Sequence, residues 1–175
     1  MRVIFLCLPL LALAACDNAD KGPKTMAQAR EEAKQLQRPE PGKYTQTTKF
    51  TKFDVPGAPP EMAERIKAMM TAKGQTTEHC LTKAESEKGF EEMFKKVGEG
   101  DCKYERFDAS ADAIDAILNC SNGQGGTARM VMNGKVGKTG STVNVNIEQK
   151  DPKQPMGNAT LAMEISSKRI GECEG

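Results

Sequence analysis

The sequence predicts an α+β domain. We expect a mainly antiparallel β-sheet, curled into a meander or an open barrel, with two or three helices packed on it and two disulfides. The C-terminal half contains consecutive short segments in which apolar and polar residues alternate, a pattern typical of antiparallel strands with one face in water. An earlier segment carries an apolar stripe at helical spacing behind a capping signal. Four cysteines follow residue 16, an even number that allows two disulfides.

The chain begins with a predicted export signal at residues 1–15. Arg2 supplies a positive start, and the apolar stretch behind it is shorter than the roughly 20 residues that a membrane-spanning helix needs. The residues Leu13-Ala14-Ala15-Cys16 resemble the bacterial lipobox. The resemblance implies cleavage between Ala15 and Cys16 and lipidation of Cys16. An ordinary cleaved signal that happens to precede a cysteine is the alternative.

Acylation of Cys16 would make the lipid bilayer the first partner of the mature protein. Each buried methylene contributes about 0.8 kcal/mol, so two or more acyl chains hold a protein to a membrane. We therefore expect a lipoprotein of the bacterial cell envelope that faces the periplasm. Asp17 resembles the signal that retains lipoproteins at the inner membrane in enteric bacteria, which favours the inner over the outer membrane without deciding between them.

The mature chain divides into a tether and one domain. Residues 16–41 form the lipidated tether with a possible short helix at 25–37, which the prolines and glycine of residues 39–42 end. Residues 42–175 form a single cysteine-stabilised, β-rich domain.

The first half of this domain is predicted to contain a strand and two helices. Residues 44–55 are rich in Thr, Phe and Tyr and form the strand, although strict alternation would place Phe50 and Phe53 on opposite faces. Residues 61–73 form a helix that Gly74 ends. Residues 83–97 form the second helix, because Thr82 and Glu85 fit a capping box and apolar residues follow at helical spacing.

The second half is predicted to form antiparallel strands at residues 103–108, 114–120, 128–132, 143–147 and 161–165. Helix is the alternative for residues 111–118. A tight turn is expected at Asn133-Gly134, with residues 137–140 as a competing turn.

The four remaining cysteines allow three pairings, of which we prefer Cys102 with Cys120 and Cys80 with Cys173. Cys102 begins one predicted strand and Cys120 ends the next, so a hairpin would place them side by side. A zinc site is disfavoured because the cysteines lack close spacing and an exported protein meets an oxidising compartment.

Composition and motifs argue against several function classes. Removal of residues 1–15 takes away Arg2 and no acid, so the mature chain is formally neutral and lacks the basic excess of a nucleic-acid binder. The single histidine, His79, is adjacent to Cys80, but neighbouring strand residues point to opposite faces. We expect no enzyme activity, no catalytic residue, no cofactor and no metal, with copper binding by methionines as a weaker possibility.

The predicted strands share an apolar face that could hold an apolar ligand or a segment of an envelope protein of unknown identity. Its proposed lining is Met130, Met132, Val143, Val145, Leu161 and Met163. A non-enzymatic binding or interaction domain is therefore the preferred function. A structural or stress accessory of envelope assembly is the alternative.

The chain resembles the uncharacterised proteobacterial envelope family catalogued as domain of unknown function 3617. The resemblance covers roughly residues 41–173 and departs from the family pattern at 57–74. It implies export, a small cysteine-stabilised domain and often a lipid anchor, but no known activity. It depends on a pair of central cysteines and on three motifs, Pro41-Gly42-Lys43-Tyr44, Cys80-Leu81-Thr82 and Ser167-Lys168-Arg169-Ile170-Gly171-Glu172-Cys173.

Overall fold

The computed structural model describes residues 22–71, 75–98, 100–154 and 157–174. The predicted signal peptide, Ala15, Cys16, Asp17 and the helix end at Gly74 lie outside the described residues. The described helices are α1 (Met26–Ala33), α2 (Pro60–Thr71), α3 (Lys83–Lys88) and α4 (Glu91–Gly98). The strands are β1 (Gly42–Asp54), β2 (Gln75–Leu81), β3 (Asp101–Ala109), β4 (Ala113–Ser121), β5 (Thr127–Val136), β6 (Gly140–Lys150) and β7 (Ala159–Gly171).

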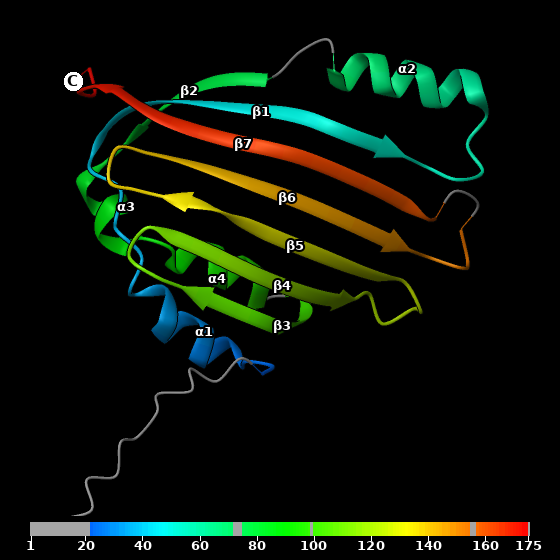
Figure 1. Ribbon diagram of the computed structural model, residues 1–175, viewed down its shortest axis with the longest axis horizontal. Helices are drawn as coiled ribbons and strands as arrows, with labels where there is room; N and C mark the ends of the chain where they lie inside the picture. Colours follow the sequence, from blue (N-terminus) through cyan, green and yellow to red (C-terminus); the bar gives the residue numbers. More distant parts are fainter. Residues whose placement is uncertain (1–21, 72–74, 99, 155–156, 175) are drawn as a thin grey trace, which may run out of the picture.

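The described strands form one antiparallel sheet with the order β2-β1-β7-β6-β5-β4-β3 (Figure 1). Strands β3 to β7 follow one another as a meander, and β1 returns to pair with β7. Because β2 and β3 occupy opposite edges, the sheet is open. The predicted antiparallel sheet with a few packed helices is therefore confirmed in its coarse form, as an open sheet and not a closed barrel.

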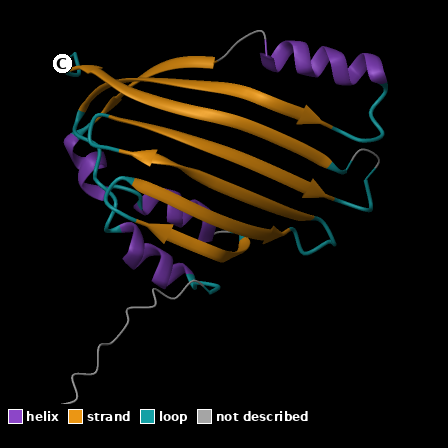
Figure 2. Ribbon diagram, in the orientation of Figure 1, coloured by secondary structure: helices purple, strands orange, loops and turns teal. Residues whose placement is uncertain are grey.

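Three of the helices lie together on one face of this sheet (Figure 2). The chain must cross from the β2 edge to the β3 edge, and the segment that makes this crossing contains α3 and α4. Helix α1 packs on β3 and α4. Helix α2 packs separately against β1. It lies beyond the part of β1 that pairs with β2 (Figure 1).

The core lies between α1, α4 and the strands β3 to β5. Its most deeply buried side chains are Phe94, Tyr104 and Phe107, whose rings contact one another at centroid distances of 5.1 to 6.1 Å. Aromatic pairs at such separations stabilise a core beyond the effect of area alone. A chain with only 5% aromatic residues thus concentrates three of them where the helices meet the sheet.

A β-bulge corrects the prediction for β1. Phe50 pairs with Met163 and Phe53 pairs with Leu161, with a register shift between them. Met163 and Leu161 are two positions apart and share a face, so Phe50 and Phe53 also share it. The prediction that the two phenylalanines face opposite sides was wrong because an extra residue in one strand reverses the alternation.

The predicted helix at 83–97 is divided into α3 and α4. The capping box is present, since the hydroxyl of Thr82 accepts from the backbone N–H of Glu85 and the Glu85 carboxylate accepts from the N–H of Thr82. Gly89 then adopts a positive φ of 59° and ends α3, a conformation that glycine reaches without strain. Phe94 of α4, beyond this break, lies in the core.

For two further segments the sequence allowed two alternative structures. Residues 113–121 form a strand, so the helical alternative for 111–118 was wrong. Asn133 and Gly134 lie inside β5, and the turn forms at 137–140, where the Gly137 N–H donates to the Gly140 carbonyl at 2.8 Å. A Cβ on Gly134 would collide with the Thr142 carbonyl oxygen, so this glycine allows close strand contact.

Both preferred disulfides are present. Cys102 and Cys120 are directly opposite each other on β3 and β4. Cys80 on β2 is bonded to Cys173, which follows β7, so this bridge joins two segments that flank β1.

Candidate functional site

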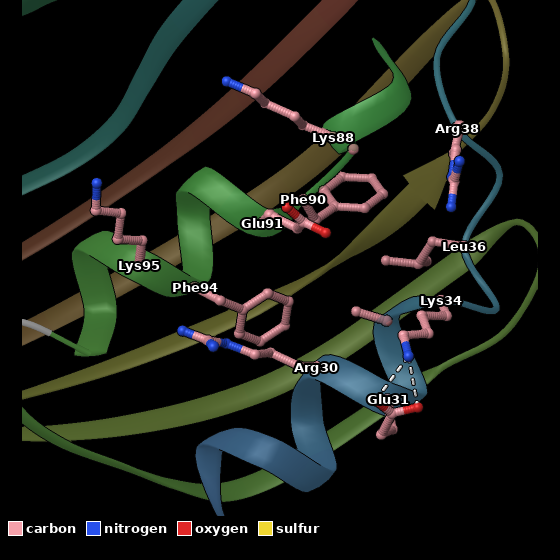
Figure 3. Close-up of a pocket in the computed structure, with 12 residues that line it drawn as sticks. Arg30, Glu31, Lys34, Leu36, Arg38, Lys88, Phe90, Glu91, Phe94 and Lys95 are labelled. Carbon is pink, nitrogen blue, oxygen red and sulfur yellow. Dashed lines mark hydrogen bonds and ion pairs between the residues drawn. The ribbon is translucent and has the colours of Figure 1, made fainter. Parts of the chain in front are cut away.

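The candidate site is a groove of about 500 Å³ between α1 and the α3–α4 segment (Figure 3). We call it the α1–α4 groove. Its volume lies within the range of small-molecule sites in proteins, roughly 300–1,000 Å³. It is lined by Arg30, Glu31, Ala33, Lys34, Leu36, Arg38, Lys88, Gly89, Phe90, Glu91, Phe94 and Lys95.

The α1 side of the groove is held in place by a hydrogen-bond network that begins at Lys24. The Lys24 ammonium forms an ion pair with Glu32 of α1 and donates to the Phe107 carbonyl of β3 at 2.7 Å. Glu32 also accepts from the Ala109 N–H at 3.0 Å. The backbone N–H of Lys24 donates to the Tyr104 carbonyl at 3.0 Å. Helix α1 is therefore fixed to the sheet by polar contacts as well as by packing.

The floor of the groove is apolar. Leu36 and Phe94 are almost completely buried, and Ala33 is also buried. Phe90 is partly buried and packs against the core cluster. In Figure 3, Phe90 and Phe94 extend from the green segment toward the blue segment that carries Leu36. Residues from both sides of the groove therefore contribute to its floor.

The rim of the groove is mainly basic. Five lysine and arginine side chains line it, against two carboxylates. Lys34 is engaged, because its ammonium pairs with both oxygens of Glu31 at 2.7 and 2.8 Å. Among the side chains that the structure describes, no carboxylate lies within ion-pair distance of Arg30, Arg38 or Lys95.

This arrangement can bind a molecule that combines an acidic group with an apolar portion. Arginine and lysine donate charge-assisted hydrogen bonds to carboxylate or phosphate oxygens. The partly exposed ring of Phe90 beside them can cover a few methylenes. The mature chain as a whole is formally neutral, so the positive rim is a local feature.

Tyr104 lies beneath this site and is chemically unusual. Its hydroxyl is buried and has no hydrogen-bond partner among the described residues. Burial raises the pKa of Tyr104 to about 12, because the phenolate would lose its hydration. The ring contacts Phe94, which forms part of the groove floor.

The six residues predicted to line an apolar ligand face do share one face of β5, β6 and β7. Met132, Val145 and Met163 are aligned across the three strands, and Leu161 pairs with Ile147, the partner of Met130. Met130, Met132 and Val143 pack against the core, and Val145 is buried. The α1–α4 groove is lined by none of the six. Met130, Met132 and Val143 thus belong to the core on which the groove is built, and ligand binding on the face of the six residues stays a prediction.

The structure places the other residues considered in the sequence outside the groove. His79 is exposed on β2 and stacks on Tyr44 at a centroid distance of 5.9 Å. Cys80 is committed to a disulfide. Met69 is 70% exposed on α2, whereas Met130 and Met132 pack against the core on the sheet. Within the described ranges, no three His, Cys, Asp or Glu side chains gather as metal ligands.

Sequence reasoning missed the basic rim. Arg30, Lys34 and Arg38 recur every four residues, a signal that was available in the sequence. The opposite wall could not be located, because it depends on the break at Gly89 and on the crossing of the sheet by α3 and α4.

Comparison with known families bears on the whole domain. The family model described as a protein of unknown function, DUF3617, matches residues 39–173. The chain belongs to the DUF3617 family. The match covers the complete sheet and both disulfides of this DUF3617 domain, whereas α1 precedes it. Neither the curated proteins nor the solved structures contain a significant match. In the described part of this DUF3617 protein, no helix has the length and apolar character needed to cross a membrane.

Proposed function

We propose that this protein is a lipid-anchored, periplasm-facing domain of the bacterial cell envelope that binds a ligand and does not catalyse a reaction. The observation that carries the binding role is the α1–α4 groove, with its apolar floor and basic rim. The ligand class that fits it is a molecule with an acidic group next to an apolar portion.

The proposed anchor supports this role because of where the groove lies in the chain. Cys16 precedes Lys24 by eight positions, and Lys24 is fixed to β3. A chain spans at most about 3.5 Å per residue, so the domain would stay within roughly 28 Å of an acylated Cys16. A domain held so close to a bilayer meets membrane molecules at high effective concentration.

The disulfides also support an envelope location. Structural disulfides persist in oxidising compartments such as the periplasm and are rare in the cytosol. The DUF3617 domain contains two, and together they engage all four cysteines beyond residue 16. A cysteine nucleophile is therefore not part of the proposal.

The test is to express the full chain in a bacterium, extract it gently from its membrane and analyse it by native mass spectrometry. We expect a co-purifying acidic, partly apolar molecule that is lost when Phe90→Asp is introduced into the groove floor. A matched Thr76→Asp variant, on the exposed face of edge strand β2, should retain it. A preparation without any bound molecule would contradict the binding role, and specific cross-links to one envelope protein would instead favour an accessory of envelope assembly.

A further inference from the structure

We infer that the α1–α4 groove binds the headgroup of an anionic phospholipid of the membrane in which the protein is anchored. This inference rests on the proposed function and names the ligand class of the same site. It follows from the rim cations that have no carboxylate partner among the described side chains, from the apolar floor and from the position of α1 soon after Cys16.

The rim offers positive charge at Arg30, Arg38 and Lys95 that no carboxylate among the described side chains pairs with. Arg30 and Lys95 lie in the last turns of α1 and α4, where the helix dipole favours cations. Arg38 lies five residues beyond the end of α1 and gains nothing from that dipole. A phosphate between the walls would accept hydrogen bonds from guanidinium and ammonium groups, and arginine suits its oxygens bidentately.

The apolar floor of the groove favours binding of a phospholipid over binding of a free phosphate ion. Inorganic phosphate could use the rim, but it would leave the partly exposed ring of Phe90 uncovered, whereas Leu36 and Phe94 are already buried. A phospholipid presents glycerol and the first methylenes of its acyl chains directly beside its phosphate. These groups would cover that ring and remove it from water.

The charge balance of the groove favours an anionic phospholipid over a zwitterionic one. Five basic side chains line the groove and two carboxylates oppose them, which leaves an excess of positive charge. A choline or ethanolamine headgroup brings its own cation into this field, whereas a glycerol headgroup does not. We therefore expect the groove to prefer a net negative headgroup.

The short stretch of chain between Cys16 and the groove makes the membrane the source of the ligand. Helix α1 begins at Met26, two residues after Lys24, whose ammonium donates to the Phe107 carbonyl of β3. It is the first helix of the described chain. Of the two walls of the groove, this one is therefore the closer along the chain to an anchor at Cys16. Basic side chains close to an anionic membrane surface are attracted to its headgroups.

The experiment uses the full chain, purified in a nonionic detergent and uniformly labelled with ¹⁵N. Three probes are titrated separately below their micellar concentrations, namely dihexanoyl phosphatidylglycerol, dihexanoyl phosphatidylcholine and inorganic phosphate. Amide shifts of Ala33, Leu36 and Gly89 report occupancy of the groove. We expect phosphatidylglycerol to bind about tenfold more tightly than either other probe.

A charge-reversal pair provides the matched control. Arg30→Glu combined with Lys95→Glu should weaken phosphatidylglycerol binding by about tenfold or more. Lys52→Glu combined with Lys150→Glu makes the same change in net charge on exposed residues outside the groove and should leave binding unchanged. Independently of any variant, affinity of the unmodified protein should fall as sodium chloride is raised from 50 to 500 mM, because screening weakens exposed charges.

Several results would overturn the inference. Equal binding of inorganic phosphate would assign the site to a free anion, and equal binding of phosphatidylcholine would show that the rim does not select charge. Shifts confined to residues outside the groove would also contradict it. If none of the probes binds while native mass spectrometry still finds another molecule lost with Phe90→Asp, the inference fails and the proposed function stands.

Discussion

The ammonium of Lys24 donates a 2.7 Å hydrogen bond to the backbone carbonyl of Phe107, 83 positions further along the chain. This contact joins the first part of the described chain to an edge strand of the sheet, and the same ammonium pairs with Glu32 of α1. One side chain thus fixes both the point where the chain enters the domain and one wall of the groove.

Lys24→Met should lower the free energy of unfolding by about 1–3 kcal/mol, because Glu32 and the Phe107 carbonyl would lose a charged donor in a partly buried place. Urea denaturation followed by circular dichroism measures this loss. Lys34→Met is the matched control, because Lys34 and its partner Glu31 are 65% and 71% exposed. Its cost should be about 0.5 kcal/mol or less. Equal costs for the two variants would show that the Lys24 network does not stabilise the domain.

Tyr104→Phe should leave the protein as stable or make it more stable by about 1 kcal/mol, since it removes a buried hydroxyl without a partner. Differential scanning calorimetry at pH 7 tests this. Tyr44→Phe is the contrast, because the Tyr44 hydroxyl donates to the Glu40 and Lys138 carbonyls and its loss should destabilise. Destabilisation by Tyr104→Phe would reveal a hydrogen bond to that hydroxyl.

The raised pKa of Tyr104 predicts a dependence of stability on alkaline pH. The unfolded chain loses this proton near pH 10, whereas the folded protein holds it until about pH 12. The folded state therefore binds more protons between these values, so stability is fully present below pH 10 and falls as pH rises toward 12. Urea midpoints between pH 9 and 12 should fall less steeply for Tyr104→Phe. If the urea midpoints of the two proteins fell equally steeply with pH, the Tyr104 hydroxyl would have to be solvent-exposed in the folded state.

Gly134→Ala should destabilise the domain by about 1–3 kcal/mol, because the added methyl would collide with the Thr142 carbonyl and lie 2.6 Å from the Cα of Val143. Thermal unfolding measures the loss. Gly171→Ala is the control, since a Cβ there meets nothing within 4 Å. A neutral Gly134→Ala would mean that β5 and β6 can separate without cost.

Removal of the two disulfides should have unequal effects. The Cys80–Cys173 bridge closes a loop of 93 residues and the Cys102–Cys120 bridge one of 18. In the chain-entropy model these loops correspond to about 5 and about 3 kcal/mol. Paired Cys→Ala variants, compared by urea denaturation, should show the larger loss for Cys80 and Cys173. The opposite order would mean that local packing outweighs loop entropy.

The sheet could be predicted because its signal is local. Val143, Val145 and Ile147 alternate with polar residues, and the structure places them on one strand with one face against the core side. The face of Phe53 could not be predicted, since a bulge depends on pairing with β7, which begins more than a hundred residues later. The turn at Asn133-Gly134 failed for a related reason, because Gly134 serves contact between strands.

The groove was hidden from sequence reasoning because its walls are distant in the chain. Arg30 and Lys95 come from helices separated by two strands and two further helices. Their meeting depends on the crossing from β2 to β3 and on the bend at Gly89. The disulfide partners were accessible, in contrast, because Cys102 and Cys120 lie at matching ends of a hairpin.

The proposed anchor at Cys16 is the claim on which location, tether and ligand source all depend. Its most direct test is the intact mass of the protein isolated from the native bacterial membrane. The account predicts a chain that begins at Cys16 and carries the added mass of a diacylglyceryl group and an amide-linked acyl chain. A chain that begins at Met1, or one cleaved without any added lipid mass, would contradict it.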